Sequence, residues 1–289
     1  MKKIMIASII FALVIQFSTY AQKEIKLSKK WEIDSVFMTP ESAVYDSIRN
    51  CLYVSNFNDK GGFRRNSDTL FDECISKVDL NGKVIDFRWV NNLLGPTGIT
   101  IFNDKLYVLE RGYLTLIDIE RHAIEKRIPI KNSGFLNDIV IDKNGDIYIS
   151  DSQKSSILKF ENNECKVWWQ DTTLCVGSNG LYIYDNKLIV GNQKNNLISV
   201  SIPGKEIKVI ASNILEGIDG LNRFKDNFIV SWRSKIALVD DKGFSNVLLD
   251  TKNNKEFLAD FEFIKKKRMI VVPTLTTNKL VTYEIVDEK

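Results

Sequence analysis

The feature that most constrains the fold of this chain is a motif that occurs six times and each time opens a similar stretch of sequence. The copy at Ser178-Asn179-Gly180-Leu181 is followed by four short runs of strand-forming residues, at 181–184, 187–192, 197–200 and 207–210. Turn residues such as Asp185-Asn186 separate these runs. A repeat of about forty residues with four strands is typical of the blades of a β-propeller.

One polar position is shared by the six openings, and we call this set the polar column. Its members are Glu41, Thr97, Asn137, Asn179, Asp219 and Asp260. From the second member onward they are 40, 42, 40 and 41 positions apart, whereas the first step is 56. Six such repeats predict an all-β, six-bladed propeller. A polar insertion at 56–73 accounts for most of the extra length in the first repeat, and it is either functional or a disordered surface loop.

The last repeat provides only three strand-like runs before the chain ends, at 261–264, 268–272 and 279–285. An alternating apolar and polar run at 31–37 is available as the fourth strand. Pairing of the two ends would close the ring and leave no exposed edge on the last blade. We therefore predict one propeller domain over 31–289, preceded by a flexible lead-in at 22–30.

The N-terminus resembles a secretory signal peptide. Met1-Lys2-Lys3 precedes an almost wholly apolar run at 4–17, which is too short for a comfortable membrane span, and Ala21 is a small residue at the expected cut. We expect a cleaved signal at 1–21 and an exported, periplasmic or extracellular protein with no membrane span. Without Lys2 and Lys3 the net charge falls from +3 to +1, which gives no reason to expect nucleic-acid binding, and we expect a monomer.

The four cysteines are compatible with disulfides if the protein is exported. Cys165 and Cys175 flank one turn and are the nearer pair, whereas Cys51 and Cys74 flank the 56–73 insertion. Buried thiols explain the same four residues equally well, and the spacing does not resemble a zinc site.

Propeller topology places the polar column at one end of the central channel, because the first strand of each blade is innermost and the column residue lies where that strand begins. The turn between the second and third strands returns to the same face. That turn adds further candidates for the wall of a pocket: Asn56, Asn58, Arg111, Asp151, Gln153, Asn192, Gln193, Trp232, Arg233 and Thr274.

The column offers oxygen ligands without imidazole or thiolate. Glu41, Asn179 and Asp219 together carry two negative charges, and Asn137 adds a neutral oxygen. Calcium accepts six to eight such oxygens, so we expect calcium or another divalent metal here. The alternative is that these residues only cap turns where strands begin. His122, the one histidine, falls in an outer turn of the second repeat, away from the channel.

Several motifs resemble the regucalcin/gluconolactonase family of six-bladed propellers and, more distantly, diisopropyl fluorophosphatase and paraoxonase. The motifs are Pro40-Glu41-Ser42, Leu136-Asn137-Asp138, Ser178-Asn179-Gly180-Leu181 and Ile218-Asp219-Gly220-Leu221, in that order, and Tyr148-Ile149-Ser150-Asp151-Ser152 is also similar.

This resemblance implies a divalent metal, usually calcium, held by Glu41, Asn179 and Asp219. It implies that Asn137 contacts the substrate or the metal, and that Asp219 acts as a general base in opening a lactone. We add Asp138, Asp151, Arg111 and Arg233 as candidate substrate contacts. Sugar lactonases often carry an arginine where this chain has Phe135, which favours a more apolar lactone or ester.

We therefore predict a calcium-dependent hydrolase that opens a lactone or related ester in the channel, with a small molecule as its partner. One alternative is a non-catalytic, secreted propeller that binds a ligand or a protein and uses the ion to hold its blades together. A second alternative is a metal-free propeller with an interaction surface.

Overall fold

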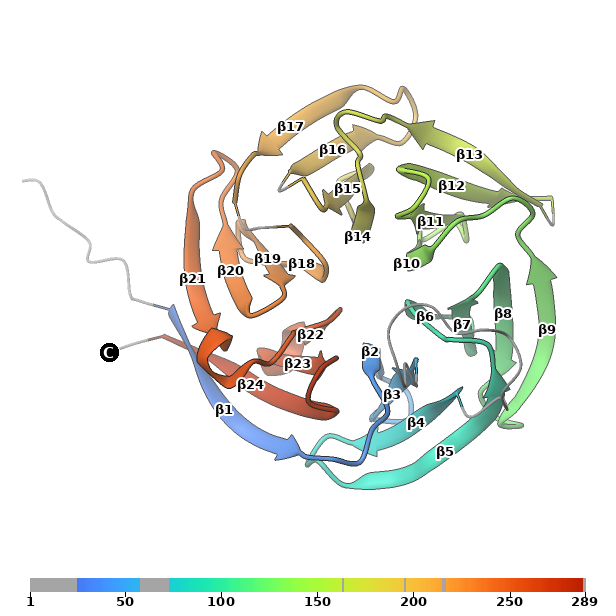
Figure 1. Ribbon diagram of the computed structural model, residues 1–289, viewed down its shortest axis with the longest axis vertical. Helices are drawn as coiled ribbons and strands as arrows, with labels where there is room; N and C mark the ends of the chain where they lie inside the picture. Colours follow the sequence, from blue (N-terminus) through green and yellow to red (C-terminus); the bar gives the residue numbers. More distant parts are fainter. Residues whose placement is uncertain (1–24, 58–72, 163, 195, 215–216, 288–289) are drawn as a thin grey trace, which may run out of the picture.

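Six four-stranded antiparallel sheets surround a central axis in the computed structural model (Figure 1). The structure describes residues 25–57, 73–162, 164–194, 196–214 and 217–287. The predicted signal peptide at 1–21 and residues 58–72 of the predicted insertion lie outside this set. The prediction of an all-β, six-bladed propeller is confirmed.

Blades 1 to 3 follow one another along the chain, and in each of them the first strand is innermost (Figure 1). Blade 1 contains β2 (Pro40–Asp46), β3 (Cys51–Asn56), β4 (Glu73–Asp79) and β5 (Val84–Leu93). Blade 2 contains β6 (Ile99–Phe102), β7 (Lys105–Glu110), β8 (Tyr113–Asp118) and β9 (Ala123–Pro129). Blade 3 contains β10 (Leu136–Ile141), β11 (Ile147–Asp151), β12 (Ser156–Glu161) and β13 (Glu164–Gln170).

Blades 4 and 5 repeat this order, and blade 6 combines both ends of the chain. Blade 4 contains β14 (Ser178–Tyr184), β15 (Lys187–Asn192), β16 (Leu197–Ser201) and β17 (Ile207–Ala211). Blade 5 contains β18 (Leu221–Phe224), β19 (Asn227–Trp232), β20 (Lys235–Val239) and β21 (Ser245–Asp250). Blade 6 contains β22 (Glu262–Ile264), β23 (Met269–Thr274), β24 (Lys279–Asp287) and β1 (Ile25–Ile33).

Two short 3-10 helices complete the described structure: η1 (Lys252–Asn254) leads from blade 5 into blade 6, and η2 (Lys265–Lys267) joins β22 to β23. No helix in these parts of the chain is long and apolar enough to cross a bilayer.

The hydrophobic core consists of six clusters, and each cluster lies between two neighbouring blades. Successive residues of a strand point to opposite faces of its sheet, so an inner strand contributes to two clusters. In β7, Leu106 and Val108 pack towards blade 1, whereas Tyr107 and Leu109 pack towards blade 3. This double burial explains why the inner strands are continuous apolar runs rather than alternating ones.

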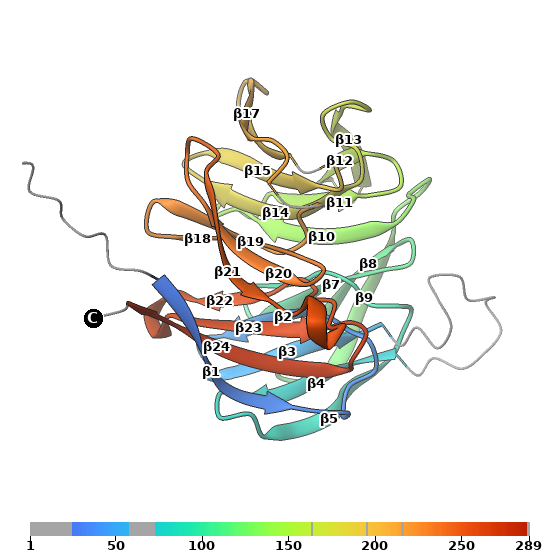
Figure 2. The same ribbon diagram turned by 60° about the vertical axis from the view of Figure 1, so that its left-hand side comes forward.

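The N-terminal strand closes the ring, as predicted, but it covers Ile25–Ile33 instead of the predicted 31–37, so it both begins and ends earlier than predicted. β1 pairs with β24 from Ile25 opposite Asp287 to Ile33 opposite Leu280, and it forms the outer edge of blade 6 (Figure 2). The prediction of a flexible lead-in over 22–30 is therefore wrong from residue 25 onward. Ile25 and Leu27 alternate with polar residues and pack against the cluster between blades 5 and 6, which is the signal for this part of the strand.

The four cysteines remain thiols. Cys51 begins β3 opposite Asp79, and Cys74 pairs with Asn56 at the other end of the same strand pair, so the two are five pairing positions apart. Cys165 packs between blades 2 and 3, whereas Cys175 packs between blades 3 and 4. Neither of the two candidate pairs is joined, in agreement with the alternative interpretation of these residues as thiols.

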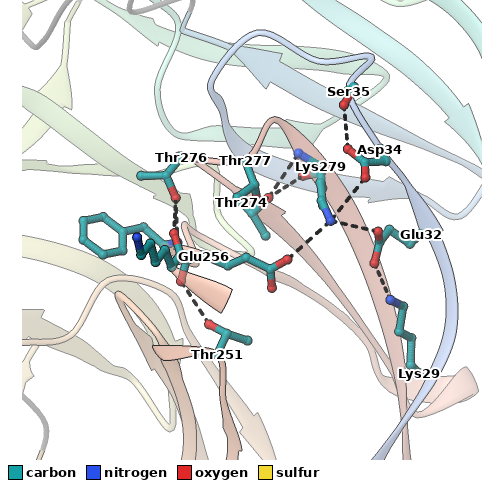
Figure 3. Close-up of polar contacts among 12 residues, drawn as sticks. Lys29, Glu32, Asp34, Ser35, Thr251, Glu256, Thr274, Thr276, Thr277 and Lys279 are labelled. Carbon is teal, nitrogen blue, oxygen red and sulfur yellow. Dashed lines mark hydrogen bonds and ion pairs between the residues drawn. The ribbon is translucent and has the colours of Figure 1, made fainter. Parts of the chain in front are cut away.

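Lys279 connects the two ends of the chain at the closing blade (Figure 3). Its Nζ lies 3.0 Å from Glu32 Oε1 and 3.3 Å from Asp34 Oδ2, both in the N-terminal segment. The same Nζ lies 3.5 Å from Oε1 of Glu256, a buried residue of the connection between blades 5 and 6. One ammonium thus compensates three carboxylates.

Substitution Lys279→Met should lower the free energy of unfolding by about 1–2 kcal/mol, because it leaves the buried Glu256 carboxylate without its counter-charge. Urea unfolding measures this. The matched control is Lys30→Met, which removes an exposed ion pair of 3.0 Å to Glu284 on the same two strands. We expect that control to cost less than about 0.5 kcal/mol, and equal losses in both variants would contradict the role given to Lys279.

Candidate functional site

The polar column lies where the innermost strand of each blade begins. Glu41, Asn137 and Asn179 are the second residues of β2, β10 and β14. Thr97, Asp219 and Asp260 each precede the first residue of an innermost strand by two positions. The six blades therefore bring the column to one end of the channel, as the repeat predicts.

In three blades the column residue lies inside an irregularity of the strand pairing. The register shifts between Pro40 and Ala43, between Leu136 and Ile139, and between Ser178 and Leu181. Bulges of this kind leave a residue outside the regular ladder and turn its side chain in a new direction. This local geometry lets the column side chains of blades 1, 3 and 4 face the axis.

A cavity of about 550 Å³ opens at this end of the channel, and Glu41, Asn137, Asn179 and Asp219 line it. These are the four residues that the sequence predicts as metal ligands. The rest of the wall is largely apolar and aromatic. It is formed by Phe57, Phe135, Ser152, Gln153, Gln193, Trp232, Arg233, Phe257, Leu258 and Leu275.

The other two members of the column do not line the cavity, because they join neighbouring blades. Thr97 is buried and donates a hydrogen bond from Oγ1 to the Leu136 carbonyl, at 3.0 Å. Asp260 accepts a hydrogen bond from Ser42 Oγ, at 2.8 Å. These two residues therefore match the alternative interpretation of the column as a set of turn and strand caps.

Three buried oxygen atoms of the cavity accept no hydrogen bond from the described residues: Glu41 Oε2, Asn179 Oδ1 and Asp219 Oδ1. Asn137 donates from Nδ2 to Ser152 Oγ at 3.2 Å, which turns the donor end of its amide towards that hydroxyl. Buried polar atoms normally have partners, so three open acceptors at one site favour a bound donor or cation.

The carboxyl groups near the axis favour their protonated form over their ionised form. Burial raises the pKa of Glu41 well above its usual range, and the charges of Asp219, Asp260 and Asp138 raise it further. Burial, and then the charge of Asp260, raise the pKa of Asp219 to about 7, against the effect of a hydrogen bond with the side chain of Asn179. A cation between these groups would favour their ionised forms.

The cavity differs from a zinc-type cluster. Among the described residues, no group of three or more His, Cys, Asp and Glu side chains is arranged as metal ligands. In this cavity Glu41 and Asp219 are carboxylates and Asn137 and Asn179 are amides, so the donors are mixed oxygens. Such a set suits a hard cation that accepts carbonyl oxygens.

Some of the predicted substrate contacts line the cavity, and others lie behind the residues that form its wall. Arg233 lines the cavity with Asn137. Asp138 does not, because Oδ2 accepts the Leu181 N–H and Oδ1 accepts the Ile139 N–H, each at 2.6 Å. Asp138 therefore joins blades 3 and 4 from behind the wall.

Asp151 and Arg111 also lie behind the wall. Asp151 is buried and accepts hydrogen bonds from the Gly134 N–H at 2.6 Å and the Lys154 N–H at 3.0 Å. Arg111 lies with its guanidinium 5.4 Å from the ring centre of Phe57 and lines a smaller cavity of about 170 Å³. Neither residue lines the larger cavity.

Sequence reasoning missed most of the apolar wall. Phe57, Ser152 and Leu275 belong to the same turns as residues that were predicted, and Phe257 and Leu258 lie shortly before Asp260. The predictions selected polar residues from these turns, although topology brings every residue of the turn to the same face. Position in the repeat was the signal that would have found them.

Solved structures with this architecture include virginiamycin B lyase from Staphylococcus aureus. A catalytically inactive histidine-to-alanine variant of it, with quinupristin, matches with a TM-score of 0.63 and 12% identity over 91% of this chain and 100% of that one. The selenomethionine form of the same lyase matches with a TM-score of 0.63 and 13% identity, again over 91% of this chain and 100% of that one. A streptogramin B lyase matches with a TM-score of 0.61 and 12% identity, over 91% of this chain and 98% of that one.

At such identities the likeness shows the fold alone. No protein-family model matches this chain, and no curated protein sequence matches it. The resemblance to the regucalcin/gluconolactonase family therefore remains a prediction from motifs.

With divalent metal removed by a chelator, the free energy of unfolding should fall as the pH rises from about 5 to 8. A carboxyl group whose pKa is raised by folding holds its proton more tightly in the folded protein. Its contribution to the free energy of unfolding is therefore largest below the pKa that it has in the unfolded chain. That stability is lost as the pH rises through the folded values, which are about 6 for Asp260 and about 7 for Asp219 and Glu262.

Glu262→Gln isolates one of these groups, because the amide oxygen can still accept the hydrogen bond of 3.1 Å from the Tyr45 N–H. This variant should lose stability less steeply with rising pH, measured by urea unfolding between pH 5 and 8. Glu206→Gln is the control, since Glu206 is exposed and its pKa is lowered by hydrogen bonds from its own backbone and from Ser201. A flat pH profile for the unmodified protein would contradict the prediction.

Proposed function

We propose that the protein is a divalent-metal-dependent hydrolase, with calcium as the expected ion, that opens a lactone or related ester in the 550 Å³ cavity. The observation that carries this proposal is the set of three buried oxygens, on Glu41, Asn179 and Asp219, that accept no hydrogen bond from any residue that the structure describes. Blades 1, 4 and 5 each supply one of them. The motif order noted in the sequence, which resembles the regucalcin/gluconolactonase family, supports the same three residues.

The donor set fits a calcium ion. Glu41 and Asp219 would hold it with carboxylate oxygens and Asn179 with an amide oxygen, which leaves part of a shell of six to eight ligands for water or substrate. When bound, the ion would supply Lewis-acid polarisation of the ester carbonyl. The ion would also supply a counter-charge to the ionised carboxylates.

The protein side chains have separate tasks in this proposal. Asp219 would take a proton from the attacking water and pass it to the leaving alkoxide, because a cation at this site would keep its carboxylate ionised at neutral pH. Asn137, fixed by its bond to Ser152 Oγ, would orient the substrate. The aromatic wall would exclude bulk water and strengthen the polar interactions inside.

The apolar wall favours an apolar acyl or aryl group over a polyhydroxylated sugar. Phe135 and Phe57 stand edge to face across part of the cavity, with ring centres 6.3 Å apart. Trp232, Phe257 and Leu275 continue this surface. Such a wall offers few partners for sugar hydroxyls, and unsatisfied hydroxyls would reduce binding.

The lyase activity in the names of the structural neighbours has less support in this chain. One of those structures is a histidine-to-alanine variant that is described as catalytically inactive. The single histidine here, His122, is exposed in the outer turn between β8 and β9 and stacks on Trp89, with ring centres 5.2 Å apart. It does not line the cavity, so a histidine-dependent elimination has no counterpart residue at this site.

Asp219→Asn should lower the turnover of a lactone and aryl-ester panel by at least about a hundredfold, because it removes the general base and one ligand charge. The unmodified protein should require calcium and lose activity in chelator. Asp226→Asn makes the same chemical change in an exposed turn of the β18–β19 hairpin and should leave turnover unchanged.

Two other results would reject the hydrolase. Absence of turnover, with calcium still raising the melting temperature, would support a structural ion in a non-catalytic binding propeller. Absence of both turnover and a calcium effect would support a metal-free propeller, since a site filled at a hundred times its Kd adds about 2.7 kcal/mol.

Phe135→Arg should move specificity from apolar towards polyhydroxylated lactones, by roughly tenfold in the ratio of kcat/KM values. The guanidinium would replace an apolar wall segment with donors for hydroxyl groups. Phe244→Arg, at a 73% exposed position away from the cavity lining, is the control. An unchanged ratio in Phe135→Arg would show that this part of the wall does not contact the substrate.

A further inference from the structure

A second hollow of about 790 Å³ lies on the same face of the propeller, beside the cavity. Its walls come from the β19–β20 turn, from the η1 connection and from the β23–β24 turn. Trp232, Arg233 and Phe257 line both hollows. The two spaces therefore share a wall, and one elongated molecule could occupy both.

The second hollow is strongly basic. Arg233, Lys235, Lys252 and Lys255 line it, and among the described residues of its lining Glu256 is the one acidic residue. Glu256 is buried, and its charge is compensated in part from outside the hollow by Lys279, which lies 3.5 Å away and also contacts Glu32 and Asp34 (Figure 3). We call Lys235, Lys252 and Lys255 the rim lysines.

The rim lysines have no ion-pair partner among the described residues. The nearest acid by strand register is Asp250, opposite Lys235 in the β20–β21 pair. Its Oδ1 accepts the Lys252 N–H at 2.9 Å, so its carboxylate is held by the η1 turn. Like charges gathered in one hollow raise the local concentration of anions and steer them to it.

The two hollows have opposite polarity. Glu41 and Asp219 lie at the axis, whereas the rim lysines lie at the outer end of the combined space, with the aromatic pair Trp232 and Phe257 between them. An anion is attracted to the rim, whereas a divalent ion at the axis would be balanced by Glu41 and Asp219 and would leave no excess positive charge there. A substrate with an anionic tail would thus enter in one orientation, with its neutral ester towards the axis.

We propose that this hollow is an anion subsite, and that the substrate is an amphipathic ester or lactone with a carboxylate, sulfate or phosphate group beyond its apolar part. The ester chemistry in this statement rests on the proposed function. The anion subsite itself rests on the hollow, its shared wall and its four basic side chains.

Binding can be tested without catalysis, using 2-naphthalenesulfonate and its neutral counterpart 2-naphthalenesulfonamide in the presence of a chelator. Isothermal titration at pH 7 should show at least tenfold tighter binding of the sulfonate to the unmodified protein. The variant Lys235→Glu/Lys252→Glu should lose at least tenfold in sulfonate affinity and keep its sulfonamide affinity within threefold.

The chain offers a matched control on its other face. Lys265 and Lys266 lie in η2, the second basic 3-10 helix, in the β22–β23 turn, and they line neither hollow. Lys265→Glu/Lys266→Glu makes the same charge change and should leave both affinities unchanged. Lys235→Gln/Lys252→Gln, which removes charge without reversing it, should give an intermediate loss and guards against misfolding of the glutamate variant.

Four outcomes would overturn the subsite: no binding of either ligand, equal binding of both, no loss in the glutamate variant, or an equal loss in the control. Sulfonate binding that is lost in the variant, together with no ester hydrolysis, would keep the subsite and reject the proposed hydrolase. A third result would keep the hydrolase and reject the subsite. In that case the unmodified protein and the Lys235→Glu/Lys252→Glu variant would hydrolyse a neutral aryl ester at the same rate, and neither would bind the sulfonate selectively.

Discussion

Packing between neighbouring blades determines where this protein can place polar chemistry. Each inner strand buries apolar side chains on both faces, as β7 does with Leu106 and Leu109, so a charged side chain would be costly in the interior of a blade. The cluster of charged and amide side chains therefore forms at the ends of strands and in the turns. The candidate site follows from this constraint, because six strand ends meet at one end of the axis (Figure 1).

The strand irregularities convert that meeting point into a cavity. A regular strand would direct alternate residues into the two inter-blade clusters. The register shifts at the starts of β2, β10 and β14 release one residue of each strand from this alternation. They also explain why Asn137 lines the cavity while its neighbour Asp138 joins two blades through the Leu181 N–H.

The sequence was sufficient to predict the architecture and the position of the polar column at one end of the axis, because both follow from the period of the repeat. It was not sufficient to distinguish Asn137 from Asp138 as a wall residue, since that depends on a local shift in register. The early start of β1 was missed because the alternation of Ile25 and Leu27 with polar residues is short and is interrupted by Ser28-Lys29-Lys30. The apolar wall was missed because apolar residues in a repeat are expected to pack between blades.

The polar column contains residues of two kinds, and hydrogen bonding separates them. Thr97 and Asp260 have partners in neighbouring blades, so a capping role accounts for both. Glu41, Asn179 and Asp219 each keep a buried oxygen without a partner in the described part of the chain. A capping role leaves those oxygens unexplained, because an unpaired buried acceptor costs stability that a different residue would avoid. The open oxygens are therefore better explained by a ligand than by the fold.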